Sequence, residues 1–90
     1  MALERRKIRF HGRVQGVGFR YRANYIASSL GLTGWVQNEY DNTVSMEVQG
    51  DSAMIDKMLL TLNSGSYIQI DWIDSEVISL KEERSFRVLY

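Results

Sequence analysis

The 90-residue sequence predicts one α+β domain in which two helices lie on one face of a mostly antiparallel sheet. Three features predict this fold class: segments whose apolar residues alternate, two segments with helical apolar spacing, and short turns between them. A chain of this length suits a single domain, which we expect to span residues 1–90. Hydrophobic residues make up 44% and charged residues 24%, a balance that is typical of globular proteins and argues against disorder.

The first strand and the first helix are predicted from a change of period. Over residues 7–14 apolar and basic side chains alternate, which predicts a half-buried strand. Gly12 falls on its apolar phase, where the missing side chain leaves room for a neighbouring segment. Residues 15–18 contain two glycines and predict a turn. From Phe19 the spacing is that of an amphipathic helix ending at Gly31, with an apolar face of Phe19, Ala23, Ile26, Ala27 and Leu30.

A hairpin and a second helix follow. Residues 33–38 and 44–49 alternate on either side of a turn at 40–42, which predicts two antiparallel strands. Asp51 or Ser52 can cap the next helix. The apolar face of that helix is predicted to consist of Ile55, Met58, Leu59 and Leu62.

Two more strands complete the predicted fold. Beyond Gly65, which follows the end of the second helix, residues 67–78 form a strand whose apolar phase changes near Asp71 and Trp72. Such a change of phase predicts a β-bulge. Residues 86–90 alternate in a short terminal strand. The order is therefore βαββαβ plus one strand, the ferredoxin-like sandwich, and because that fold hosts many functions the site must be argued separately.

Composition and charge exclude several kinds of site and partner. There are no cysteines, so disulfides and thiol chemistry are excluded, and we expect a cytoplasmic protein. No apolar run approaches the ~18 residues of a membrane span, and the charged N-terminus does not resemble a signal peptide. The net charge of zero argues against a nucleic-acid partner. Residues 1–22 nevertheless hold seven basic side chains and one acidic one, which favours a small anionic ligand there.

The segment from Gln15 to Arg20 is the strongest candidate site. A strand ends, Gly16 and Gly18 turn the chain, and a helix begins, so backbone amides without intrahelical partners point outward. The positive end of the helix dipole favours a phosphate at such a junction, and Arg20 could bind its oxygens through two donors. Neither the dinucleotide-binding nor the Walker pattern is complete. The alternative interpretation is an ordinary tight turn with a surface arginine.

Two signatures resemble those of the acylphosphatase family. One is Gln15-Gly16-Val17-Gly18-Phe19-Arg20, and the other is Gly34-Trp35-Val36-Gln37-Asn38 followed by Val44 and Gly50. The similarity in length and element order extends along the chain and weakens after Tyr67. One departure is Asn42, which stands where the family usually has a turn glycine; asparagine also tolerates positive φ, so we expect the turn to survive.

This resemblance implies an activity and a set of residue roles. It implies an enzyme without metal or cofactor that hydrolyses the carboxyl–phosphate bond of small-molecule acyl phosphates. Nothing in the sequence demands more than a monomer, so we expect a monomer. Arg20 and the loop amides of Gln15, Gly16, Val17, Gly18 and Phe19 would bind the phosphate, and Asn38 would orient the attacking water. Inorganic phosphate and sulfate are then expected to compete with the substrate.

Two other functions are weighed against this one. Ferredoxin-like domains often bind single-stranded RNA through sheet aromatics, but the first strand offers Phe10 on its core face and His11 outward, which does not follow that motif. The chain could also bind a phosphorylated metabolite without turnover, although the presence of both Arg20 and Asn38 argues against this.

The remaining polar and aromatic side chains are interpreted as structural. His11, the only histidine, is expected on the surface because a metal site needs several ligands. Arg22 lies about 200° around the helix from Arg20 and is expected to be solvated. Trp35 and Trp72 are expected to cover a sheet edge or a helix. A solvated acidic face, without metal-binding spacing, is expected from Asp71, Asp74, Glu76, Glu82 and Glu83.

Overall fold

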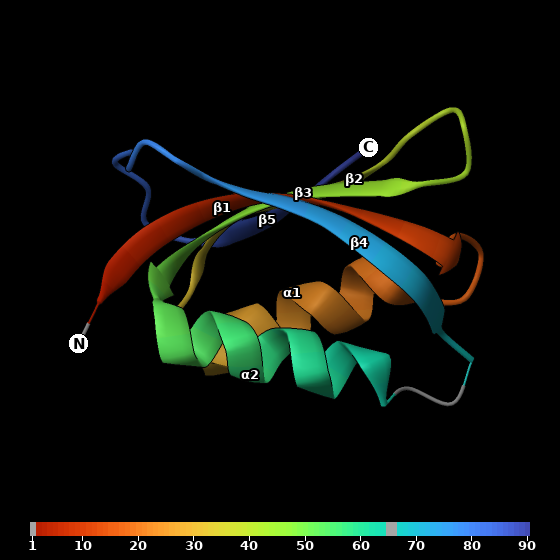
Figure 1. Ribbon diagram of the computed structural model, residues 1–90, viewed down its shortest axis with the longest axis horizontal. Coiled ribbons are helices and arrows are strands. Elements are labelled where there is room, and N and C mark those ends of the chain that lie inside the picture. The colour runs from red at the N-terminus through yellow and green to blue at the C-terminus, as the bar shows by residue number, and fades with distance from the viewer. Residues whose placement is uncertain (1, 65–66) are drawn as a thin grey trace.

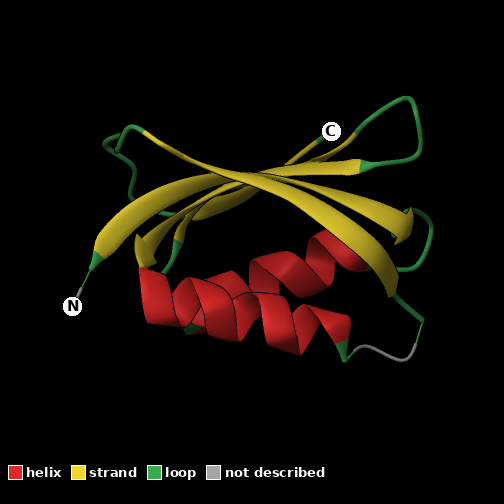
Figure 2. Ribbon diagram, viewed as in Figure 1, coloured by secondary structure: helices red, strands yellow, loops and turns green. Residues whose placement is uncertain are grey.

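The computed structural model describes residues 2–64 and 67–90, so the predicted role of Gly65 lies outside the described residues. A five-stranded sheet is covered on one face by two helices, as Figure 1 and Figure 2 show. The predicted ferredoxin-like α+β class is therefore confirmed. The elements in chain order are β1 (Leu3–Arg13), α1 (Phe19–Ser29), β2 (Thr33–Asn38), β3 (Val44–Asp51), α2 (Ser52–Asn63), β4 (Gln69–Ile78) and β5 (Phe86–Leu89).

The order of strands places the two sequence signatures at one end of the sheet. The strands run β4-β1-β3-β2-β5, and each neighbouring pair is antiparallel except β2 and β5, which are parallel. Val44 of β3 pairs with Phe10 of β1 on one side and with Asn38 of β2 on the other. The turn that follows β1 therefore lies beside the end of β2, although the two segments are distant in the sequence.

The core lies between the sheet and the two helices. The predicted apolar faces are confirmed, since Phe19, Ala23, Ile26 and Ala27 of α1 and Ile55, Met58 and Leu62 of α2 are buried. The ring of Phe19 packs on Phe10, with 4.9 Å between centroids, which seats the start of α1 against β1. Asp51 caps α2, because its side chain accepts a hydrogen bond from the Ala53 amide at 3.3 Å. Neither helix, as far as it is described, is long and apolar enough to cross a membrane.

The predicted bulge lies between β1 and β4. The register shifts between His11 and Gly12, so that Asp71 has no partner on β1. A Cβ atom on Gly12 would lie 2.2 Å from the Gln69 carbonyl oxygen, so the predicted close approach of a neighbouring segment is confirmed. The first strand also begins earlier than predicted, at Leu3, because backbone pairing with β3 continues beyond the alternating segment.

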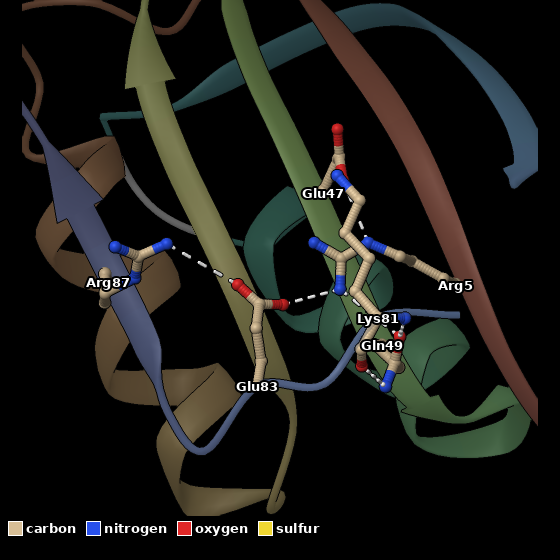
Figure 3. Close-up of polar contacts among 6 residues, drawn as sticks. All are labelled: Arg5, Glu47, Gln49, Lys81, Glu83 and Arg87. Carbon is tan, nitrogen blue, oxygen red and sulfur yellow. Dashed lines mark hydrogen bonds and ion pairs between the residues drawn. The ribbon is translucent and has the colours of Figure 1, made fainter. Parts of the chain in front are cut away.

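A buried ion-pair network lies on the sheet face opposite the helices. Arg5 is 0% exposed and lies between two carboxylates, with its Nε 2.8 Å from Glu47 Oε1 and its Nη1 2.5 Å from Glu83 Oε1 (Figure 3). Lys81 Nζ lies 3.2 Å from Glu47 Oε1, and Arg87 Nη2 lies 3.6 Å from Glu83 Oε2. The network attaches the segment between β4 and β5 to the sheet.

This network corrects one expectation about the acidic residues. Asp71, Asp74, Glu76 and Glu82 are exposed as predicted, but Glu83 is largely covered, because the chain after β4 folds back over Arg5. Burial by itself would raise the pKa of Glu47, but the hydrogen bonds from Arg5 and Lys81 outweigh it and lower that pKa. Glu47 therefore stays ionised beside the buried guanidinium.

Candidate active site

The turn between β1 and α1 takes left-handed backbone conformations at both of its glycines. The φ angles are 73° at Gly16 and 78° at Gly18. Gly18 is also the N-cap of α1, and no side chain caps that helix. A Cβ atom at either glycine would meet nothing within 4 Å among the described residues, so conformation rather than crowding requires glycine here. The amides of the first helical turn and the positive end of the helix dipole are thus available to an anion.

A small pocket brings residues of the two sequence signatures together. It has a volume of about 160 Å³, and its walls are formed by Val14, Gly16, Gly18, Phe19, Arg20, Tyr21 and Asn38. The oxygen Oδ1 of Asn38 is buried and has no hydrogen-bond partner within the described part of the chain. Asn38 itself lies in the pocket wall, and an acceptor without a partner among the described residues is free to receive a new hydrogen bond.

The side chain of Gln15 connects the turn to the β2–β3 hairpin. Its Nε2 donates to the carbonyl oxygens of Glu39 at 2.7 Å and Thr43 at 2.8 Å. This amide therefore holds the turn against the segment that directly follows Asn38. Neither Gln15 nor Val17 contributes to the pocket wall, whereas Gly16, Gly18 and Phe19 do. The signature motif pointed to Gln15, but only the structure shows what its side chain holds.

Asn42 takes over the conformational role of a glycine in the hairpin turn. Its φ angle is 72°, in the left-handed region, so the expectation that the turn survives is confirmed. The turn is closed by a hydrogen bond from the Glu39 amide to the Thr43 carbonyl oxygen at 2.9 Å. The Asp41 carboxylate accepts hydrogen bonds from the hydroxyl and the amide of Thr43, which lower the pKa of Asp41.

Contacts from the C-terminus hold Arg20. Its Nη1 donates to the Leu89 carbonyl oxygen at 3.2 Å, and its guanidinium carbon lies 5.2 Å from the centroid of the Tyr90 ring. The hydroxyls of Tyr21 and Tyr90 are 3.3 Å apart, and this contact raises the pKa of Tyr90. Sequence reasoning did not find these contacts, since alternation in the last strand says nothing about its neighbours.

Of two polar residues that were expected at the surface, Arg22 contacts the second helix and His11 lies near the surface. Arg22 was expected in solvent, but this expectation is wrong: its Nη2 donates to the Thr61 carbonyl oxygen at 2.9 Å, because α1 packs beside α2. His11 does lie near the surface, where it stacks on Trp72 with 4.4 Å between ring centroids and pairs with Asp74 at 2.8 Å. Trp72 is 57% exposed, and its ring contacts a side chain of the neighbouring strand β1. Within residues 2–64 and 67–90, no three potential metal-ligating side chains gather.

Fold and pocket together define a small ferredoxin-like protein whose pocket has the chemistry of an anion-binding helix N-terminus. A model of the acylphosphatase family matches residues 6–88. The chain belongs to the acylphosphatase family and is a hydrolase of that class.

Individual relatives agree with this assignment. The chain is 37% identical over 90 residues to an acylphosphatase of Clostridium acetobutylicum, covering 98% of this chain and 99% of the relative. It is 41% identical over 81 residues to an acylphosphatase of Geobacillus kaustophilus, covering 88% of this chain and 86% of the relative. The crystal structure of acylphosphatase from Bacillus subtilis superposes with a TM-score of 0.90 at 30% identity, covering 99% of this chain and all of that one.

Proposed function

We propose that this chain hydrolyses acyl phosphates by direct attack of water on a phosphoryl group bound between the turn and Arg20. The observation that carries the proposal is the shared pocket: Arg20, the glycine turn and Asn38 line one cavity of about 160 Å³. Among the described residues, the Oδ1 atom of Asn38 has no hydrogen-bond partner. An acyl phosphate is a mixed anhydride with a good leaving group, so no serine or cysteine nucleophile is needed. Catalysis then rests on positioning and on charge stabilisation.

The phosphoryl group is bound by positive charge from two sources. The amides of the turn, Gln15 to Phe19, and the N-terminus of α1 supply one, and the guanidinium of Arg20 supplies the other. Arg20 has five N–H donors, and its contact with the Leu89 carbonyl occupies one of them. The remaining donors are enough for a two-point contact with phosphate oxygens while the C-terminal strand keeps the side chain in place.

Asn38 orients the water. Its Oδ1 accepts a hydrogen bond from the water, which then attacks phosphorus in line with the leaving carboxylate. The new bond joins water oxygen to phosphorus, the bond between phosphorus and the acyl oxygen breaks, and the carboxylate leaves with that electron pair. Because an amide is a weak base, the water proton passes to a phosphate oxygen. The products are a carboxylate and inorganic phosphate.

Substitutions at Asn38 test this assignment. With benzoyl phosphate as substrate, Asn38→Ala should lower kcat by roughly 10²–10³, which is typical for one preorganised transition-state hydrogen bond. Inhibition by inorganic phosphate should stay unchanged. Asn38→Asp should also be slow, and it should weaken phosphate inhibition, because a carboxylate repels the anion.

Circular dichroism should first show that both variants are folded. An Asn38→Asp variant that turns over benzoyl phosphate as fast as the parent would assign Asn38 a different role. A folded parent protein that binds phosphate but does not hydrolyse benzoyl phosphate would instead favour a binding module.

We also propose that residues 1–90 act as one domain and as a monomer in the cytoplasm, with phosphate and sulfate as competing anions. The family match over residues 6–88 supports the single domain, and the lack of cysteines supports the reducing compartment. The pocket is lined by residues of one chain, so no second copy is needed to complete it. Light scattering behind size-exclusion chromatography tests the monomer, and an inhibition series with phosphate and sulfate tests the competition.

A further inference from the structure

A larger groove lies next to the pocket and shares part of its wall. The groove has a volume of about 640 Å³, and Gly18 and Tyr21 line both it and the pocket. A Cβ atom on Gly18 would meet nothing within 4 Å among the described residues, so there is open space at this part of the shared wall. A ligand whose phosphate fills the pocket can therefore extend into the groove.

The geometry of an in-line reaction restricts where the leaving group can lie. An in-line displacement requires the attacking water and the leaving carboxylate on opposite sides of phosphorus. Asn38, which we propose holds the water, lines the pocket but not the groove. The groove extends from the part of the wall formed by Gly18 and Tyr21. A leaving acyl group in the groove is kept apart from Asn38, as this arrangement requires.

The groove offers an aromatic surface. Tyr25 lies one helical turn after Tyr21 on the same face of α1, and Tyr67 approaches from the segment beyond α2. The side chains of Tyr25 and Tyr67 are 71% and 77% exposed, although both are large and partly apolar. Val17 also lines the groove, and none of the lining residues within the described ranges is acidic. Exposed tyrosines beside an anion site suit a planar or apolar group attached to that anion.

We propose that this tyrosine groove, defined by Tyr21, Tyr25 and Tyr67, binds the acyl substituent of the substrate. The chain then favours acyl phosphates with aryl or bulky apolar acyl groups over those with small ones. This inference rests on the proposed function, because it takes the pocket as the phosphoryl site. A second apolar groove of about 470 Å³ lies between α2 and β4 and includes Leu60, but it shares no lining residue with the pocket. It therefore serves as a control surface.

The test compares benzoyl phosphate with acetyl phosphate in the parent and in Tyr25→Ala and Tyr67→Ala. Each variant should raise KM for benzoyl phosphate about three- to tenfold, the range expected for loss of one aromatic contact. Neither variant should change kcat/KM for acetyl phosphate or inhibition by inorganic phosphate. Tyr25→Phe and Tyr67→Phe should retain the parent KM because they keep the ring. Leu60→Ala, an exposed apolar residue on the other helix, should leave both substrates unaffected.

Several results would overturn the proposal. Equal losses on both substrates would make the tyrosines structural, and no loss on either would place the acyl group elsewhere. A selective loss in Leu60→Ala would move it to the groove between α2 and β4. Tyrosine substitutions that impair only a phosphorylated protein substrate would assign the groove to a macromolecule. A parent protein that hydrolyses neither substrate would instead refute the proposed function, so the two failures can be told apart.

Discussion

Arg20 and Asn38 are each positioned by a contact that lies outside their own motif. Arg20 is held by the Leu89 carbonyl and the Tyr90 ring, while the hairpin after Asn38 is held to the turn by the side chain of Gln15. Both contacts reduce the conformational freedom of a long side chain or a loop before substrate binds. Such preorganisation is what a reaction without a protein nucleophile requires.

Arg20 can be tested through anion binding. Arg20→Ala should abolish measurable turnover and also weaken inhibition by phosphate and sulfate, because the cation contributes to both. Arg20→Lys should restore neither, since an ammonium group cannot reproduce the planar two-point contact. Inhibition constants for phosphate in the folded variants provide the measurement. Normal inhibition in Arg20→Ala would place the anion site elsewhere.

At the scale of secondary-structure elements, glycines act in two physically different ways. Gly18 needs its left-handed conformation and has open space around it, whereas a Cβ atom on Gly34 would lie 1.9 Å from the Glu47 carbonyl oxygen of β3. The first position is a matter of backbone strain alone, whereas Gly34, whose φ angle is 138°, combines backbone strain with a close strand contact. Both the turn and the β2–β3 ladder therefore depend on glycine, for separate reasons.

This difference predicts unequal effects on stability. Gly18→Ala should lower the free energy of unfolding by about 1–2 kcal/mol, the strain of one left-handed residue. Gly34→Ala should lower it by about 3 kcal/mol or more, because strands β2 and β3 must move apart. Urea denaturation of both variants gives the comparison. Equal losses would mean that the strand contact relaxes freely.

The Arg5 network joins β1, β3 and the segment before β5, and it predicts a pH dependence. The pKa of Glu47 is lowered in the folded protein, so its stabilising contribution is complete above the unfolded value of about 4.3 and is lost as the pH falls through the folded value. At pH 7, Glu47→Gln should reduce the free energy of unfolding by about 1–3 kcal/mol.

The predicted direction of this pH dependence can be tested by denaturing the parent protein and Glu47→Gln at pH 7 and at pH 3. The difference between the two proteins should shrink at the lower pH, because Glu47 takes up a proton in the unfolded state more readily than in the folded state, where its pKa is lowered. A difference that stays constant over this range would show that the charge of Glu47 contributes nothing to stability.

At the scale of the whole molecule, the strand order determines where the site is. β3 lies between β1 and β2 and is antiparallel to both, so β1 and β2 end at the same edge of the sheet. The turn after β1 and Asn38 at the end of β2 are therefore close together. The parallel strand β5 lies beside β2 and brings the C-terminus to Arg20. The site thus draws on residues that lie far apart in the sequence.

Activity is expected to be independent of divalent metals. In the proposed mechanism the positive charge comes from Arg20 and the turn amides, and no three metal-ligating side chains cluster among the residues that the structure describes. Dialysis against a chelator should therefore leave benzoyl phosphate hydrolysis unchanged, and added magnesium or zinc should not stimulate it. Loss of activity on dialysis with recovery on adding either metal would contradict the mechanism.

The sequence by itself determined the local features of this protein. Periodicity located both helices and their buried faces, the phase change near Asp71 located the bulge, and the residue type at position 42 anticipated a left-handed turn. The two signatures identified the residues Arg20 and Asn38, which the pocket brings together. All of these depend on interactions between residues near one another in the chain, or on motifs contained in a few positions.

Only the tertiary structure decided which distant residues meet. Alternation shows which face of a strand is buried but not which strand lies beside it, so the contacts of Arg20 with Leu89 and Tyr90 could not be inferred. For the same reason Arg22 was expected in solvent although it reaches α2, and Glu83 was expected there although it covers Arg5. Charged side chains carry no periodic signal of burial, and their partners are chosen by the packing of the apolar core.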